Sequence, residues 1–132
     1  MIASEISGKV WGKTQKIFDN GAVSVHRIFA MKGGYSSMHK HQFRFNMFYV
    51  ESGSMKIVTR KNDYDLTDET IIGAGQTAIA KPNEWHKFEA LADTVAFEIY
   101  YGSCEDGDII REGHGGVYKF AEIIEGSRNG NT

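Results

Sequence analysis

Short runs of alternating apolar and polar residues, separated by glycine-containing turns, constrain the fold of this chain most strongly. Side chains on a β-strand point to opposite faces in turn, so a period of two is typical of a half-buried strand. Residues 23–31, 46–51 and 94–101 show this alternation. Turn sequences such as Gly33-Gly34 stand between the runs. With fifteen glycines and one proline in the chain, the pattern predicts an all-β sandwich or barrel of many short strands.

Apolar residues at helical spacing are scarce in this sequence. The one candidate is a short helix near the C-terminus, over residues 118–124. A chain of 132 residues with 41% hydrophobic side chains can bury the core of one compact domain. We therefore expect a single domain over residues 1–125 and a flexible tail over residues 126–132, where small polar residues predominate.

The bulk composition argues against several kinds of partner and location. The formal net charge of −2 gives no sign of a nucleic acid or an anionic membrane as a partner. A single cysteine, Cys104, makes an intrachain disulfide impossible, which favours a reducing compartment. Residues 1–9 lack the apolar segment of a signal peptide, and no apolar run reaches the length of a membrane helix. We expect a cytoplasmic protein whose partner is a small molecule.

Three histidines form the strongest candidate for a functional site. His39 and His41 are two residues apart, so on a strand both point to the same side. His86 follows a proline turn in a later β-like segment and shares its parity with Phe88. Three neutral imidazoles with an open fourth position are typical of a metal site that binds a ligand or performs chemistry. The three histidines predict one divalent transition metal, which could be Zn, Mn, Fe or Ni.

The order and spacing of these histidines resemble the cupin superfamily. The first cupin motif, G-x5-H-x-H-x(3,4)-E-x6-G, matches at every position but one, at Gly33, His39, His41, Asn46 in place of the glutamate, and Gly53. The second motif, a glycine, a proline turn and a histidine, matches at Gly75, Pro82 and His86. The resemblance implies a single-domain cupin, a jelly-roll barrel of two antiparallel sheets with the metal and its ligand inside the mouth.

A narrower likeness, over most of residues 10–112, is to the isomerase-type cupin domain of type II mannose-6-phosphate isomerases. The matching residues are Trp11, Gly12, Ser37, His41, Arg44, Val50, Ser52, Gly53 and the run from Glu105 to Arg111. This resemblance implies a homodimer and an isomerase or epimerase acting on a sugar or sugar phosphate. The metal would polarise a carbonyl or hydroxyl group and Arg44 would orient an anionic group, while Glu98 or a metal-bound hydroxide would move the proton.

Several of these roles have competing interpretations. Asn46 either coordinates the metal through its amide oxygen or hydrogen-bonds water or substrate, while Gln42 or water completes the shell. Arg44 could instead form a surface salt bridge, Glu98 could be a solvated or paired strand glutamate, and His114 could reach the pocket as part of a lid. Two other functions stay open, namely a non-catalytic cupin that binds a small ligand or carbohydrate, and a metal-dependent dioxygenase or lyase.

Overall fold

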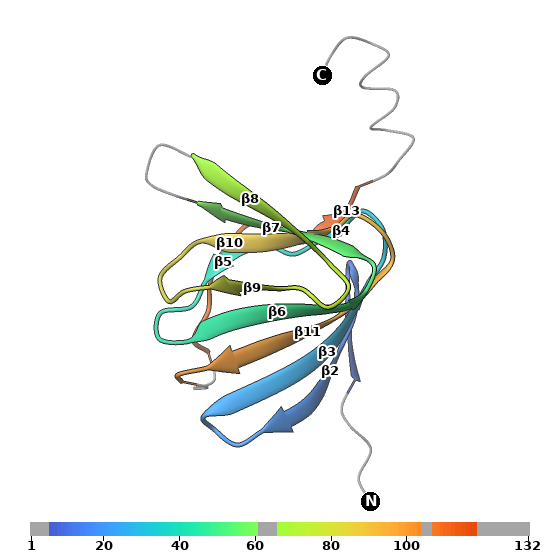
Figure 1. Cartoon of the computed structure of the whole chain (residues 1–132). Helices are drawn as coiled ribbons and strands as arrows, with labels where there is room; N and C mark the ends of the chain where they lie inside the picture. Colours follow the sequence, from blue (N-terminus) through green and yellow to red (C-terminus); the bar gives the residue numbers. More distant parts are fainter. Residues whose placement is uncertain (1–5, 61–65, 104–106, 119–132) are drawn as a thin grey trace, which may run out of the picture.

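The computed structural model, shown in Figure 1, describes residues 6–60, 66–103 and 107–118. These ranges contain thirteen strands and no helix, and every strand pairing is antiparallel. The strands make two sheets that face each other across the interior. The predicted all-β, two-sheet architecture is therefore confirmed.

Two predictions fall on residues outside the described ranges. These are the C-terminal helix beyond Tyr118 and the tail over residues 126–132. In the part of the chain that is described, no helix has the length and apolar character needed to cross a membrane.

The first sheet has the strand order β1-β2-β3-β11-β6-β9. Its strands, in chain order, are β1 (Ile6–Lys9), β2 (Gly12–Asp19), β3 (Val23–Ala30), β6 (Phe45–Ser52), β9 (Thr77–Ala80) and β11 (Thr94–Tyr101). β11 lies between β3 and β6, where Glu98 is opposite His26 on one side and Phe48 on the other. β11 is therefore paired along both of its edges, and Glu98 on it lies between residues of β3 and β6.

The second sheet is centred on β10. One edge of β10 (His86–Ala90) pairs along its length with β7, and the other edge pairs with β5 and then β4. The outer positions belong to β8, beside β7, and to β12 and β13, beside β5 and β4. The bounds of these strands are β4 (Gly34–Tyr35), β5 (Met38–Lys40), β7 (Ser54–Arg60), β8 (Thr67–Gly73), β12 (Ile110–Glu112) and β13 (Gly116–Val117).

The space between the sheets is apolar toward one end of the strands and polar toward the other. On β10, Phe88 is buried in the apolar core and His86, two residues earlier on the same face, is buried in the polar part. On β6, Phe48 and Asn46 repeat this arrangement. The apolar core consists of Trp11, Ile28, Ala30, Phe48, Val50, Met55, Ile57, Ile72, Phe88, Ala90 and Ala96. Burial of these side chains stabilises the fold, and the polar end is left for the site.

The inward face of β11 carries smaller or more polar side chains than its outward face. Ala96 and Glu98 point inward and are buried, whereas Val95 and Phe97 on the other face are half-buried. Alternation predicts the strand but not which face is enclosed, because a barrel with a polar cavity need not turn its largest apolar side chains inward.

Two glycines of the predicted motifs have positive φ angles, which strain the backbone of any residue with a Cβ. Gly53, in the turn between β6 and β7, has φ +100°, and a Cβ there would lie 2.5 Å from the carbonyl oxygen of Asp93. Gly33, before β4, has φ +86°, and a Cβ there would lie 2.7 Å from the carbonyl oxygen of Tyr118. Glycine is required at both places because it has no Cβ and accepts positive φ.

Candidate metal centre and cavity

The three histidines predicted as ligands meet between the two sheets. His39 on β5 is the direct cross-strand neighbour of His86 on β10, and His41 follows β5 by one residue. Ring centroids are 4.4 Å apart for His39 and His86, 5.1 Å for His39 and His41, and 5.3 Å for His41 and His86. One nitrogen from each ring lies within 4.8 Å of the others, and all three side chains are buried. Such a cluster could hold one metal ion.

Each imidazole is oriented by a hydrogen bond from Nδ1 to a backbone carbonyl oxygen. The acceptors are Ser37 for His39 at 2.7 Å, Asp108 for His41 at 2.7 Å and Glu84 for His86 at 2.8 Å. A carbonyl oxygen can only accept, so Nδ1 carries the proton in all three rings. Their Nε2 atoms are then unprotonated in the neutral form, which is the state needed to bind a metal.

Burial keeps these imidazoles neutral. Desolvation lowers the pKa of His39 to about 3 and that of His41 to about 4, and it also lowers the pKa of His86. Repulsion from neighbouring cationic groups adds to the effect, for example from Arg111 on His39. Neutral imidazoles are available to a metal because no proton has to be displaced from Nε2.

Asn46 completes the cluster from the opposite sheet. Its Oδ1 lies 3.2 Å from Nε2 of His86, so two acceptors face each other. Nε2 of His41 is buried with no hydrogen-bond partner among the described residues. A reversed amide would satisfy the contact with His86 but not Nε2 of His41, whereas a cation bound to the cluster would engage both histidines. The donor set therefore fits a metal ion.

The connection that leads into β12 supports the histidine loop from outside. Besides the carbonyl bond to His41, the carboxylate of Asp108 accepts hydrogen bonds from the backbone N–H groups of Gln42 at 2.7 Å and Phe43 at 3.1 Å. Gln42 and Phe43 are both exposed. The expectation that Gln42 completes the metal shell is therefore wrong, because the Asp108 contacts hold that turn at the surface.

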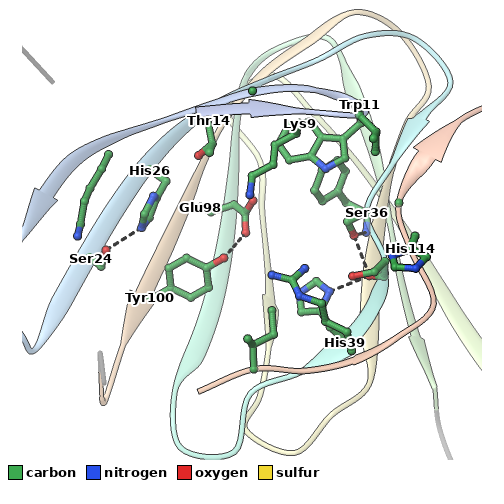
Figure 2. A pocket seen from close by; sticks show the side chains of 18 of the residues that line it. Lys9, Trp11, Thr14, Ser24, His26, Ser36, His39, Glu98, Tyr100 and His114 are labelled. Carbon is green, nitrogen blue, oxygen red and sulfur yellow. Dashed lines mark hydrogen bonds between the residues drawn. The ribbon is translucent and has the colours of Figure 1, made fainter. Parts of the chain in front are cut away.

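A cavity of about 650 Å³ opens beside the cluster, between the β1–β2 hairpin, β3, β11 and the connection from β12 to β13. Figure 2 shows Glu98 and Tyr100 on one wall and His39 on the other. Tyr100 donates a 2.6 Å hydrogen bond to the carboxylate of Glu98. The cavity is large enough for a small-molecule ligand.

Glu98 is enclosed rather than solvated, with 8% of its surface exposed. Burial raises the pKa of Glu98 above its usual value, and the hydrogen bond from Tyr100 and the charge of Arg44 lower it in part. Burial and the neighbouring carboxylate raise the pKa of Tyr100 well above 10, so the phenol stays protonated. A buried carboxylate held by a neutral donor is suited to act as a general base near neutral pH.

Arg44 lines the cavity and makes no ion pair among the described residues. Its guanidinium carbon lies 3.9 Å from the ring centroid of Tyr100, a cation–π contact. Its Nε is 3.3 Å from Nδ1 of His41, but that nitrogen already donates to Asp108 and is not free to accept. Within the described part of the chain Arg44 thus faces the cavity rather than an acidic partner, and its role stays a prediction.

Two further histidines also line the cavity. His26 on β3 contacts Ser24 through a 2.8 Å hydrogen bond and packs edge-on against Tyr100. His114 lies among glycines between β12 and β13 and faces the same cavity (Figure 2). His114 thus lies at the cavity, and its role in a lid stays a prediction.

Sequence reasoning did not identify Tyr100, Lys9, Asp108 and Arg111 as parts of the site. Tyr100 had a usable signal, because it shares its strand face with Glu98. Lys9 and Asp108 come from segments whose position depends on long-range pairing, which local sequence does not report.

The cupin domain family model matches residues 27–100, which is more than half of the chain. No curated protein matches the sequence. Several solved structures are similar in fold, at identities that carry no further information about function.

KdgF from Halomonas sp. is 12% identical, with a TM-score of 0.67 over 77% of this chain and 89% of that one. An RmlC-like cupin from Shewanella frigidimarina NCIMB 400 is 18% identical, with a TM-score of 0.65 over 78% and 87%. Pac13, described as a nucleoside dehydratase, is 12% identical, with a TM-score of 0.69 over 84% and 86%. The chain spans only 34% of the capsular polysaccharide assembling protein CapF from Staphylococcus aureus, at 17% identity and a TM-score of 0.73.

Proposed function

The chain belongs to the cupin family, and from that premise we propose that it is a metal-dependent enzyme that transfers a proton on a small hydroxylated substrate. His39, His41 and His86 would hold one divalent transition metal, with Asn46 beside it. The substrate class we propose is a sugar or sugar phosphate, and the reaction an isomerisation or epimerisation.

One observation carries this proposal. Three buried imidazoles converge, and one of them, His39, lines the cavity that also holds the buried pair of Glu98 and Tyr100. A non-catalytic binding module has no need of a carboxylate with a raised pKa in this place. The pair therefore favours an enzyme over a carbohydrate-binding cupin.

Each residue around the cavity would have a separate role in the reaction. When bound, the metal would act as a Lewis acid on a carbonyl or hydroxyl oxygen of the substrate. In an isomerisation, the Glu98 carboxylate would take the proton from the hydroxylated carbon next to the carbonyl and return it to the former carbonyl carbon, while the hydroxyl proton passes to the former carbonyl oxygen. In an epimerisation the proton would return to the same carbon on its other face, and in both cases the carboxylate is regenerated. The Tyr100 hydroxyl would keep Glu98 in position, and Arg44 would orient an anionic group.

Elimination of water is the second candidate reaction, and the same pair of residues supports it. In a lyase, Glu98 would remove a proton from carbon and pass it to the hydroxyl group on the adjacent carbon, which would leave as water. One structural neighbour bears the name of a nucleoside dehydratase. A dioxygenase would not require the Glu98–Tyr100 pair, so we rank that function below both.

The test is a screen of aldoses, ketoses and their phosphates with the metal-loaded protein in deuterated water. An isomerase or epimerase incorporates deuterium at the carbon next to the carbonyl, which NMR detects, whereas a lyase forms an unsaturated product that absorbs ultraviolet light. Glu98→Gln should abolish either signal. The exposed glutamate at position 51, which pairs with Arg27 outside the cavity, provides the matched control Glu51→Gln. Turnover that survives Glu98→Gln would contradict the proposal.

The homodimer and the cytoplasmic location stay predictions. Light scattering of the purified protein measures the mass of the species in solution and decides the first. A dimer should have twice the mass of 14.8 kDa that the sequence gives.

A further inference from the structure

Cationic side chains from three separate elements converge on the cavity. Lys9 comes from β1, Arg44 from the turn before β6 and Arg111 from β12, and all three line the same space. Arg111 is the cross-strand neighbour of His39, so it flanks the histidine cluster. β1, the turn before β6, and β12 are far apart in the sequence. Their three positive side chains come together only because the chain folds.

The side chain of Lys9 points toward the cavity, although Lys9 lies on an exposed edge strand. β1 is an exposed four-residue strand at the edge of the first sheet. Figure 2 nevertheless shows the Lys9 side chain directed into the cavity, toward the carboxylate of Glu98. No ion pair of Lys9 occurs within the described part of the chain. Its ammonium group shares the cavity with the Glu98 carboxylate, with which it interacts electrostatically, and it is placed to meet an anionic ligand there.

The charges around the cavity do not balance. Among the described residues, the lining includes four cationic side chains, Lys9, Lys16, Arg44 and Arg111, against two carboxylates, Asp19 and Glu98. Lys16 and Asp19 pair with each other at 2.9 Å. What is left is three cations against Glu98, whose carboxylate accepts the hydroxyl of Tyr100.

The histidine cluster adds no negative charge. Its fourth member is the neutral amide of Asn46, which stands where the cupin motif has a glutamate. A divalent ion bound there would therefore increase the positive charge of the cavity. A positively charged cavity wall attracts an anionic ligand, because opposite charges are then brought together.

We propose that the cavity selects a ligand carrying an oxyanion, either a carboxylate or a phosphate group, and that Lys9 is a specificity-determining residue for it together with Arg44 and Arg111. The inference deepens the proposed function, because it names the charge of the substrate for the same cavity. Arg44 and Arg111 can grip planar oxyanions with their paired N–H groups, and Lys9 supplies a point charge from the opposite hairpin.

The test uses a built-in reporter. Trp11 lines the cavity and is one of two tryptophans in the chain. In a Trp85→Phe background Trp11 is the one remaining tryptophan, so a change in tryptophan fluorescence reports a ligand entering the cavity. Glucose, glucuronate and glucose 6-phosphate serve as probes, since the first is neutral, the second has a carboxylate and the third has a phosphate.

The expected result is saturable binding of at least one anionic probe, about tenfold or more tighter than glucose. Lys9→Ala should remove most of that preference, Lys9→Arg should restore it, and the matched control Lys13→Ala should leave it unchanged. Lys13 is exposed on β2 and does not line the cavity. The stronger of the two anionic probes identifies the oxyanion. Equal binding of all three probes, binding of none, or an effect of Lys13→Ala equal to that of Lys9→Ala would overturn the inference.

Metal analysis of the same samples separates this inference from the proposed function. Protein that binds metal but does not prefer anions would contradict the inference and leave the proposed function standing. Protein that binds no metal but prefers anions in a Lys9-dependent way would support the inference and contradict the metal-dependent function.

Discussion

The amide oxygen of Asn46 and Nε2 of His86 lie 3.2 Å apart across the two sheets, with an acceptor atom on each side of the gap. Nδ1 of His86 already donates to the carbonyl oxygen of Glu84, so Nε2 has no proton to offer in the neutral ring. The same region holds Nε2 of His41 without a hydrogen-bond partner. A cation bound to the cluster would engage the unprotonated Nε2 atoms of both histidines.

The first prediction concerns the amide that replaces a carboxylate. Asn46→Asp keeps the shape of the side chain and adds a negative charge to the cluster, so divalent metal ions should bind about tenfold or more tightly. Isothermal titration of the metal-free protein measures the change. Asn20→Asp adds the same charge in the exposed turn before β3 and should have little effect. Unchanged affinity in Asn46→Asp would place Asn46 outside the metal's coordination shell.

The second prediction concerns the acidic limb of the pH profile. Burial raises the pKa of Glu98, and the reaction needs the ionised carboxylate. Activity should therefore rise with pH through the raised pKa and should be low at pH values where an ordinary glutamate is already ionised. Tyr100→Phe removes the hydrogen bond that lowers this pKa, so the acidic limb of kcat/KM should move to higher pH. A limb that stays in place would contradict the role given to the pair.

The third prediction concerns stability without metal. The folded chain holds His39 and His41 with a pKa of about 3 and about 4, against 6.5 as the usual value. Between pH 6.5 and 4 the unfolded chain binds more protons than the folded one, so stability falls as pH falls through this window. Each histidine contributes up to about 1.4 kcal/mol per pH unit. Urea unfolding between pH 7 and 5 measures this slope, and His39→Gln should make it shallower. An unchanged slope in that variant would contradict the buried neutral imidazole.

The fourth prediction separates steric from conformational requirements at glycine. Gly53 and Gly75 both have positive φ, but a Cβ at Gly53 would clash with Asp93, and a Cβ at Gly75 would meet no atom within 4 Å. Gly75→Ala should cost about 1 kcal/mol of unfolding free energy, from backbone strain alone. Gly53→Ala should cost clearly more, which thermal or urea unfolding would show. Equal losses would mean that the turn at Gly53 relaxes freely.

The fifth prediction concerns the support of His41 by Asp108. Asp108→Ala removes the two carboxylate bonds to the backbone of the histidine turn but keeps the carbonyl bond to His41. The turn should lose order, and metal affinity should fall by about tenfold. The exposed Asp68 on the outer strand β8 offers a control, Asp68→Ala, that leaves the three hydrogen bonds to Asp108 in place. Unchanged metal affinity in Asp108→Ala would show that the carbonyl bond is sufficient.

Much of the fold and the centre of the site could be predicted from sequence, because both depend on local periodicity and fixed spacing. Alternation identified the strands around Phe48 and Ala96, and the two-residue spacing of His39 and His41 placed both on one side. The parity of His86 with Phe88 likewise put the third imidazole inside. In each case the information lies within a few neighbouring residues.

The rest of the site depends on contacts between distant segments. Lys9 reaches the cavity because β1 folds back along β2, and Asp108 reaches His41 across 67 positions of sequence. Whether Glu98 is solvated or enclosed is decided by its neighbours on β3 and β6 rather than by its own strand. Gln42 shows the opposite error, because its proximity to His41 in sequence does not bring it into the cluster.

The most direct test of the metal centre is the metal content of protein purified without chelator or added metal, measured by mass spectrometry alongside His41→Ala and His114→Ala. His114 lines the cavity but lies outside the cluster of three. We predict close to one transition-metal ion per chain in the wild type and in His114→Ala, and its loss in His41→Ala. Wild-type protein that is folded, free of metal and unable to take up an added ion would contradict the account.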